Sequence, residues 1–158
     1  LQTACQAGQI KRLPAFHCVQ PAGNNTIAGP LLAGTDRAQT CRSTTKIGGL
    51  QVASVLDGND VIAACRDTGG SGYLVEDEFV YEVQALLARQ EGIFCEPSAA
   101  VSLAGILQAA AERKITSKET VVCVITGSGF KDQGSVDRML AGTTSPVISL
   151  TEFIDQTA

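Results

Sequence analysis

The chain has 158 residues, a formal net charge of −4 and a hydrophobic content of 44%. This length suits a single domain, which we expect to span residues 1–158, and the apolar content argues against a disordered chain. Because no basic stripe is present, neither nucleic acid nor an acidic membrane is an expected partner. No apolar run reaches the length of a membrane-spanning helix.

The cysteines of the chain are scattered, and no two form a CxxC pair, so the sequence predicts no metal site. Four of them stand in apolar runs, where Cys behaves as a small hydrophobic residue. These are Cys18, Cys65, Cys95 and Cys123. We therefore expect reduced, buried thiols and a cytoplasmic protein. The sequence begins with Leu1 and has no signal-peptide pattern, so we expect a piece of a longer protein.

The sequence of the first half of the chain predicts two short strands, with a weak helical pattern, a loop and a helix between them. Residues 14–20 (PAFHCVQ) form an apolar strand that ends at the turn sequence PAGNN. A weak helical pattern follows over residues 26–32, and residues 34–49 are polar and loop-like. A helix is expected over residues 57–66, and the glycines after it precede a very short strand at residues 73–75.

Two strong helical patterns occupy the middle of the chain. Apolar residues recur at helical spacing over residues 76–90, and the acidic first turn of this segment suits the positive end of a helix dipole. Pro97 fits the first turn of a second helix, because its missing N–H costs nothing there. Residues 99–114 are nearly apolar all round, which indicates a helix buried within a layered fold.

The last part of the chain begins with a continuous β-branched run, TVVCVI, at residues 120–125. Such a run is typical of a parallel strand buried on both faces. The glycine-rich sequence TGSG follows at residues 126–129, and then a helix over residues 135–141 and a strand over residues 146–150 are expected. The alternation of strands and helices predicts a layered α/β/α fold with a mainly parallel sheet.

In open α/β sheets, ligands bind beyond the carboxyl ends of the strands. Three loops stand at such positions, at residues 23–25, 46–49 and 126–129. The last is the most specific, because its glycines allow close backbone approach and the hydroxyls of Thr126 and Ser128 can donate or accept hydrogen bonds. It is not a Walker A loop, since the lysine and spacing differ, and it lacks the third glycine of the dinucleotide fingerprint.

Two further candidates have a structural explanation. Glu96 could act as a general base, but a Glu beside a helix start more often satisfies free backbone N–H groups. His17, the only histidine, lies in an apolar strand and is expected in the core. Nothing near His17 supports a Ser-His-Asp or Cys-His arrangement.

The order of these motifs resembles that of a known family. The sequences EGIFCEPSAAVSLAGILQAAAERK and VVCVITGSGFKD are similar to the carboxyl-terminal part of threonine synthases. Those enzymes belong to the tryptophan-synthase-β-like (fold type II) group of pyridoxal-phosphate-dependent enzymes. The resemblance is best over residues 76–132, and it implies that the chain is the carboxyl-terminal part of a tryptophan-synthase-β-like fold.

The resemblance implies roles for individual residues. It places Thr126 at the pyridine nitrogen of pyridoxal 5'-phosphate, with Gly127 and Ser128 along the same cofactor edge. It places Ile47 and Gly48 on the substrate side of the ring. A neutral hydroxyl cannot stabilise a protonated ring as a carboxylate would, which favours elimination and replacement over transamination.

The resemblance also implies that this chain holds no catalytic residue. The family's Schiff-base lysine and its phosphate loop lie far toward the amino terminus, in a missing amino-terminal half. Lys131 stands in a segment that superficially resembles the lysine motif, but an extra glycine separates Ser128 from Phe130, and Gln133 replaces the arginine. We therefore expect Lys131 to be an ordinary protonated amine.

The implied reaction is that of threonine synthase, which converts O-phosphohomoserine to threonine and phosphate by γ-elimination and water addition. The implied partners are an amino-acid substrate, the missing half and a second copy in a homodimer of the complete enzyme. One alternative is a serine/threonine dehydratase or a β-replacement enzyme of the same fold. An alternative of another class is a non-catalytic, stand-alone binding domain. We expect the chain alone to be inactive and to bind the cofactor weakly.

Overall fold

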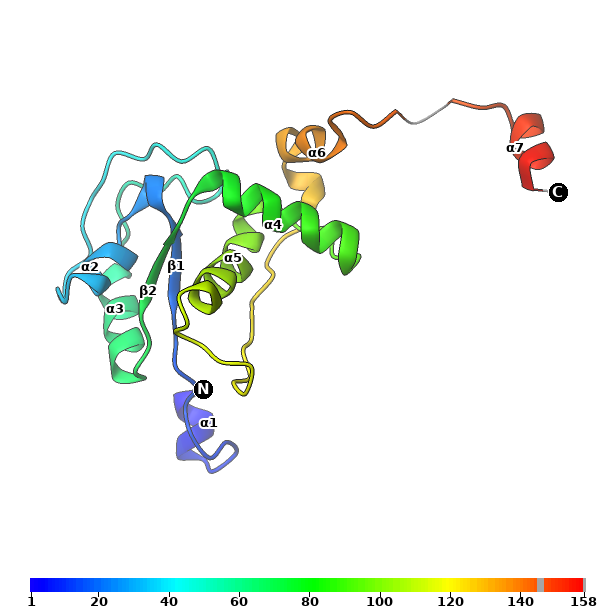
Figure 1. Ribbon diagram of the computed structural model, residues 1–158. Coiled ribbons are helices and arrows are strands. Elements are labelled where there is room, and N and C mark those ends of the chain that lie inside the picture. Colours follow the sequence, from blue (N-terminus) through cyan, green and yellow to red (C-terminus); the bar gives the residue numbers. More distant parts are fainter. Residues whose placement is uncertain (145–146, 158) are drawn as a thin grey trace.

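The computed structural model describes residues 1–144 and 147–157 (Figure 1). The described helices and strands are, in chain order, α1 (Gln2–Gln6), β1 (Cys18–Pro21), η1 (Ala22–Asn24), α2 (Ala28–Leu32), α3 (Gly58–Asp67), β2 (Gly72–Val75), α4 (Asp77–Gln90), α5 (Pro97–Ala111), η2 (Gly129–Lys131), α6 (Gln133–Leu140) and α7 (Leu150–Thr157). The two strands pair in parallel, with Cys18 opposite Gly72. The predicted α/β fold with a parallel sheet is confirmed, and among the described residues that sheet has two strands.

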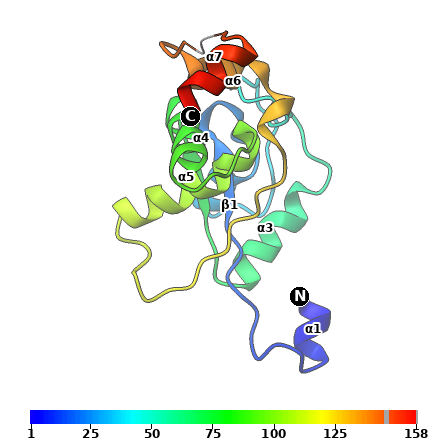
Figure 2. The same ribbon diagram turned by 90° about the vertical axis from the view of Figure 1, so that its right-hand side faces the viewer.

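The sheet is the middle layer of three. Figure 2 shows α4 and α5 on one side of β1 and α3 on the other. Successive side chains of a strand point to opposite faces, and β1 follows this rule. Val19 packs against the apolar cluster of α4 and α5, whereas Cys18 packs against the cluster formed with α2 and α3. The sheet is thus covered on both faces, as parallel sheets generally are.

The helices α4 and α5 contribute most of the larger cluster. Helix α5 begins with Pro97 in its first turn, as predicted, and buries a row of small residues. Gly105 is needed within this row, because a Cβ there would lie 2.5 Å from the Val19 side chain. The small side chains therefore let α5 approach β1 closely. The far side of α5 is more open than the apolar sequence predicts, and Leu107 is exposed.

The first half of the chain follows the predicted order, with local differences. The strand predicted from residue 14 begins only at Cys18, and the backbone N–H of Phe16 instead donates to the Thr68 hydroxyl. The prediction that His17 lies in the core is wrong. Its side chain is exposed, and its Nδ1 accepts a hydrogen bond from the Ser71 backbone N–H at 3.1 Å. His17 lies one residue before β1 begins, so the layers that pack on the sheet do not cover it.

The buried strand predicted over residues 120–125 is absent. The segment has no strand assignment, and Val122 and Val124 are 83% and 69% exposed. A β-branched run becomes a buried strand only if another strand pairs with its backbone, and none does so among the described residues.

The end of the chain agrees with the sequence-based expectation in one helix and differs from it in one strand. Helix α6 confirms the helix predicted at residues 135–141, although it begins at Gln133 because the Asp132 carboxylate caps the Ser135 N–H. The strand predicted at residues 146–150 is wrong over its described part, since residues 147–149 have no regular structure and Leu150 begins α7. Residue 146 lies outside the described residues. Figure 1 shows α7 apart from the other helices.

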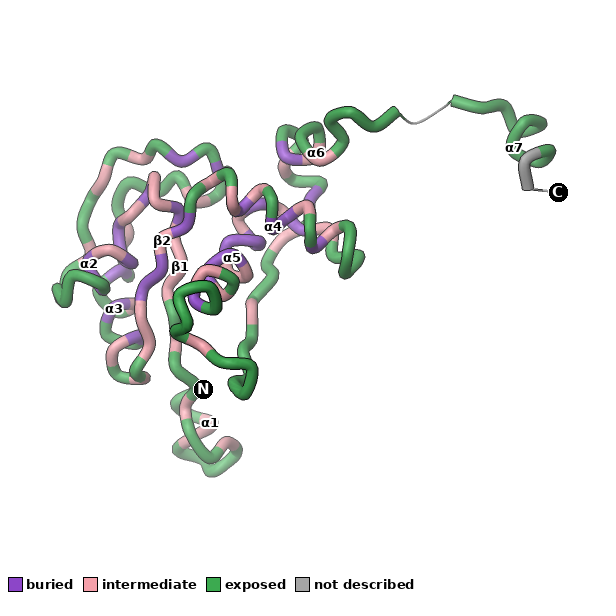
Figure 3. The backbone as a smooth tube through the Cα atoms, viewed as in Figure 1, coloured by how far each residue is buried: buried purple, intermediate pink, exposed green. Residues whose placement is uncertain are grey.

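Burial is concentrated in the layered part of the fold, as Figure 3 shows. All six cysteines are free; Cys65 and Cys95 are buried, as predicted, but Cys18 and Cys123 are only half-buried. No helix among the described residues is long and apolar enough to cross a membrane. The expectation that residues 1–158 form one domain stays a prediction.

Candidate functional site

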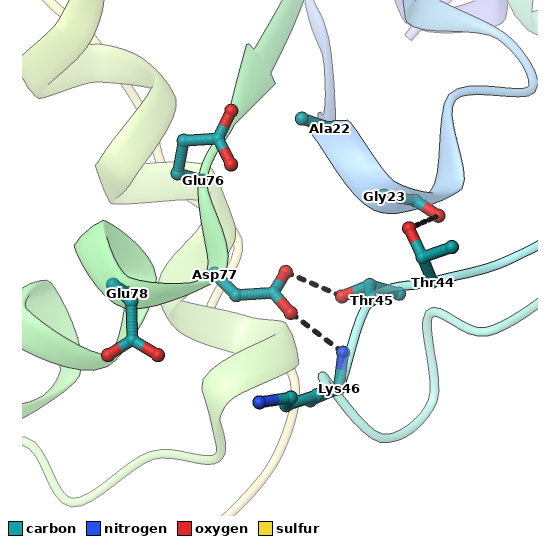
Figure 4. Close-up of a pocket in the computed structure, with 8 residues that line it drawn as sticks. All are labelled: Ala22, Gly23, Thr44, Thr45, Lys46, Glu76, Asp77 and Glu78. Atoms are coloured by element: carbon teal, nitrogen blue, oxygen red, sulfur yellow. Dashed lines mark hydrogen bonds between the residues drawn. The ribbon is translucent and has the colours of Figure 1, made fainter.

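Two of the three predicted loops meet at the carboxyl ends of the parallel strands. Strand β1 leads into η1, and β2 leads into the first turn of α4. Between them lies an open pocket of about 360 Å³ (Figure 4). It is lined by Ala22, Gly23, Thr44, Thr45, Lys46, Glu76, Asp77 and Glu78. This is the edge at which ligands of open α/β sheets bind.

Asp77 fixes the loop at one wall of this pocket. Its two carboxylate oxygens accept hydrogen bonds from the Thr45 hydroxyl at 2.6 Å and from the Lys46 backbone N–H at 2.7 Å (Figure 4). The Thr45 hydroxyl oxygen in turn accepts a bond from the Ile47 N–H at 3.2 Å. Hydrogen bonds to a carboxylate are stronger than those between neutral groups. Asp77 therefore sets the backbone path into Ile47 and Gly48.

Gly23 forms the facing wall, and its lack of a side chain is required. A Cβ there would lie 2.6 Å from the Thr45 backbone nitrogen. The Gly23 carbonyl accepts a bond from the Thr44 N–H at 2.8 Å, which holds the two loops together.

The third predicted loop, at residues 126–129, is held by the segment before α5. The Glu96 N–H donates to the Gly127 carbonyl, and the Gly129 N–H donates to the Phe94 carbonyl, both at 3.1 Å. These bonds form an isolated antiparallel bridge between Cys95 and Ser128. A Cβ on Gly127 would collide with the Glu96 carboxylate, so the loop needs glycine there. Glu96 stands at the start of α5, as expected, but the prediction that its side chain satisfies free N–H groups there is wrong, because the carboxylate makes no capping hydrogen bond and packs beside Gly127 instead.

The hydroxyl groups of this loop face outward. Thr126 is exposed, and its side chain has no hydrogen-bond partner within the part of the chain that the structure describes. Ser128 is also exposed, and its oxygen accepts a bond from the Phe130 N–H at 3.4 Å. The Thr126 hydroxyl is therefore free to bond to a ligand, while the backbone beneath it is fixed.

Gln84 anchors both flanks of this loop, and the sequence-based reasoning missed it. It is fully buried on α4, and its amide nitrogen donates to the Cys95 carbonyl at 2.8 Å and to the Ser135 hydroxyl at 3.0 Å. Ser135 also bonds to Asp132, just after the loop. A Gln on the otherwise apolar inner face of α4 was the signal in the sequence.

Asp132, which follows the loop at residues 126–129, lies beside Gly48. Gly48 is exposed, and a Cβ on it would lie 3.7 Å from an Asp132 carboxylate oxygen. The carboxylates of Asp132 and Asp77 also both act on Tyr81, whose pKa is raised by burial and then by these charges. The Gly48 loop and the loop that ends at Asp132 are neighbours.

Ile47 is placed differently from its neighbour. Its side chain is fully buried in the cluster of α4 and α5, so it supports the loop from below. Within residues 1–144 and 147–157, no hydrogen bond or ion pair joins Ile47 or Gly48 directly to residues 126–128. Lys131 is exposed, with its Nζ 3.9 Å from Glu96 Oε1.

Comparison with known proteins finds one matching family profile and several similar proteins. Residues 2–127 match the sequence profile of the family described as "Pyridoxal-phosphate dependent enzyme". Threonine synthase of Synechocystis sp. is 32% identical over 144 residues, which is 87% of this chain and 35% of the relative. Threonine synthase of Mycobacterium tuberculosis is 33% identical over 129 residues, 80% of this chain and 33% of the relative.

Solved structures agree with the fold. O-ureido-L-serine synthase aligns with a TM-score of 0.59 and 18% identity, over 98% of this chain and 41% of that protein. The chain spans about a third of the length of the two threonine synthases it matches. Because the family profile covers most of the sequence, including the loop up to Gly127, the chain belongs to the pyridoxal-phosphate-dependent enzyme family.

Proposed function

We propose that this chain is the carboxyl-terminal part of a pyridoxal-phosphate-dependent lyase of the threonine synthase type. The complete enzyme would convert O-phosphohomoserine to threonine and phosphate by γ-elimination followed by addition of water. The observation that carries the proposal is the loop at residues 126–129, which combines a fixed backbone with a free Thr126 hydroxyl. The similarity to threonine synthases over most of the chain supports this choice of reaction.

Thr126 suits a neutral contact to the cofactor. When bound, pyridoxal phosphate supplies an electron sink for reactions of amino acids. The Thr126 hydroxyl donates a hydrogen bond to the pyridine nitrogen without offering a negative charge that would keep that nitrogen protonated. Gly127 and Ser128 line the same edge of the ring. This environment favours loss and replacement of side-chain groups over transamination.

The Gly48 loop supplies the substrate side of the proposed site. Gly48 is exposed and lies beside Asp132, so its backbone can approach a bound ligand closely. Ile47 acts from the core, and Asp77 holds the backbone on the opposite side. Loop geometry is thus set by contacts that leave the ligand-facing surface free.

The reaction is tested in the complete enzyme that contains this chain, supplied with O-phosphohomoserine. We expect release of phosphate together with threonine. Thr126→Val should lower kcat about fivefold or more, because it removes one hydrogen bond worth about 1 kcal/mol. Thr126→Ser keeps the hydroxyl and is the matched control. Deamination of serine or threonine without phosphate chemistry would instead favour the dehydratase alternative.

A further inference from the structure

Polar contacts hold helix α6 onto the fold. All its residues are described, and among them Ser135 alone is buried. Near the start of the helix, the Ser135 hydroxyl accepts a bond from the buried Gln84 amide at 3.0 Å. Near its end, the Arg138 guanidinium donates two hydrogen bonds to the Glu78 carboxylate, at 2.7 and 3.0 Å. The helix therefore has a buried anchor at one end and an exposed ion pair at the other.

Arg138 also lies against Tyr81 of α4. Its guanidinium carbon is 4.5 Å from the centre of the Tyr81 ring, which suits a cation–π contact. Tyr81 in turn packs against the apolar cluster to which Ile47 belongs. The end of α6 is thus connected to the part of the core that supports the loop at residues 46–49.

Asp132 links the start of α6 to the same loop. Its Oδ1 accepts a hydrogen bond from the Ser135 N–H at 2.8 Å and caps the helix. Its Oδ2 is the atom that a Cβ on Gly48 would meet at 3.7 Å. Because one carboxylate serves both the helix and the loop, a shift of α6 changes what lies beside Gly48. Figure 1 shows α6 at the same end of the fold as the turn from β2 into α4.

We propose that Arg138 is a positioning residue for the loop at residues 46–49. By holding α6 against α4, it keeps the Asp132 carboxylate beside Gly48. That this loop is the substrate side of the site rests on the proposed function. The two parallel bonds of Arg138 fix the direction of the helix. The pair is also easily released, because an exposed ion pair contributes little to stability and is screened by salt.

The first test follows the Gly48 amide by ¹H–¹⁵N NMR in this chain alone. Arg138→Met and Glu78→Gln should each move the Gly48 signal. The double variant should move it no further than Arg138→Met, because both changes break one pair. Arg138→Lys keeps the charge without the paired geometry and should move the signal part of the way. Arg66→Met is the matched control, since it breaks another exposed pair, with Asp36, and should leave the Gly48 signal in place.

Salt separates this effect from a general change in the fold. At about 1 M salt the screening length falls to about 3 Å. The Gly48 signal of the unaltered chain should then move toward its position in Arg138→Met. The signal of Arg138→Met itself should move much less, because that variant has no pair to screen.

The consequence for the site is measured in the complete enzyme that contains this chain. Arg138→Met should raise the KM for the amino-acid substrate about threefold or more, while kcat stays within about twofold because the Thr126 contact is unchanged. The comparison uses whichever amino acid the enzyme turns over. Failure of the O-phosphohomoserine reaction would therefore leave this test intact.

Three outcomes overturn the proposal. The first is a Gly48 signal that neither Arg138→Met nor Glu78→Gln moves. The second is a signal that Arg66→Met moves equally. The third is a KM that Arg138→Met leaves unchanged, which would limit Arg138 to holding α6.

Discussion

The backbone of Glu96 and the backbone of Gly127 lie in direct contact, and the Glu96 side chain fills the space beside Gly127. The Glu96 N–H donates to the Gly127 carbonyl at 3.1 Å, and a Cβ on Gly127 would overlap the Glu96 carboxylate. This contact joins the start of α5 to the loop that presents Thr126. The position of the proposed cofactor contact is therefore set by the buried helix behind it.

Replacing Gly127 with Ala should strain this contact. We expect Gly127→Ala to lower the free energy of unfolding by about 1–3 kcal/mol, because the new methyl group must displace a carboxylate that is mostly covered. Urea denaturation followed by circular dichroism measures the change. Gly134→Ala is the control. Its Cβ would meet Asp132 only at 3.6 Å within α6, so it should be neutral or stabilising. Equal destabilisation by both would contradict the contact.

Replacing Gln84 should release both flanks of the same loop. Gln84→Met keeps the shape of the side chain but leaves the Cys95 carbonyl buried without its donor. Loss of this donor should lower the free energy of unfolding by about 1–3 kcal/mol. We expect a value at the lower end, because the substitution also removes the Gln84 amide oxygen, which is buried without a hydrogen-bond partner.

Amide hydrogen exchange locates this effect. The N–H groups of Glu96 and Gly129 should exchange faster in Gln84→Met, while those within β1 should not change. Gln90→Met makes the same substitution at an exposed position of the same helix and should leave exchange at the loop as it is. Faster exchange spread evenly over the chain would show that Gln84 acts on global stability alone.

How much the sequence predicts can be judged from these residues. Helical periodicity predicted α4 and α5 and the place of Pro97, because local spacing reports one buried face. The run at residues 120–125 predicted a buried strand, and this failed because strand burial depends on a distant partner. Gln84 was missed for a related reason. Its bonds reach residues 11 and 51 positions away, and no local pattern contains them.

Stability should fall at high pH because of Cys18. Burial, followed by the nearby Cys65, raises the pKa of the Cys18 thiol from 9.0 to about 12. A thiol whose pKa is higher in the folded state than in the unfolded state contributes to the stability of the fold. This contribution is fully present below pH 9.0 and is lost as the pH rises from 9.0 toward 12. Thermal denaturation between pH 8 and pH 11 measures the loss. In Cys18→Val, stability should fall less as the pH rises. An unchanged fall would show that other groups cause it.

Lys131 should not act as the lysine that holds the cofactor. Its side chain is exposed and lies 3.9 Å from Glu96, in contact range of a negative charge rather than in an apolar pocket. Treatment of this chain with pyridoxal phosphate and borohydride, followed by peptide mapping, should give no stoichiometric label. Complete and selective labelling of Lys131 would make the loop itself a catalytic centre.

The most direct test of the proposed role of Thr126 is the ¹⁵N chemical shift of the cofactor's pyridine nitrogen in the complete enzyme. With Thr126 in place, we expect the shift of an unprotonated nitrogen that accepts a hydrogen bond, because a hydroxyl donates without adding charge. In Thr126→Asp we expect the shift of a protonated nitrogen, since an adjacent carboxylate favours the charged ring. A protonated nitrogen in the wild type, or a shift that neither Thr126→Val nor Thr126→Asp changes, would contradict the account.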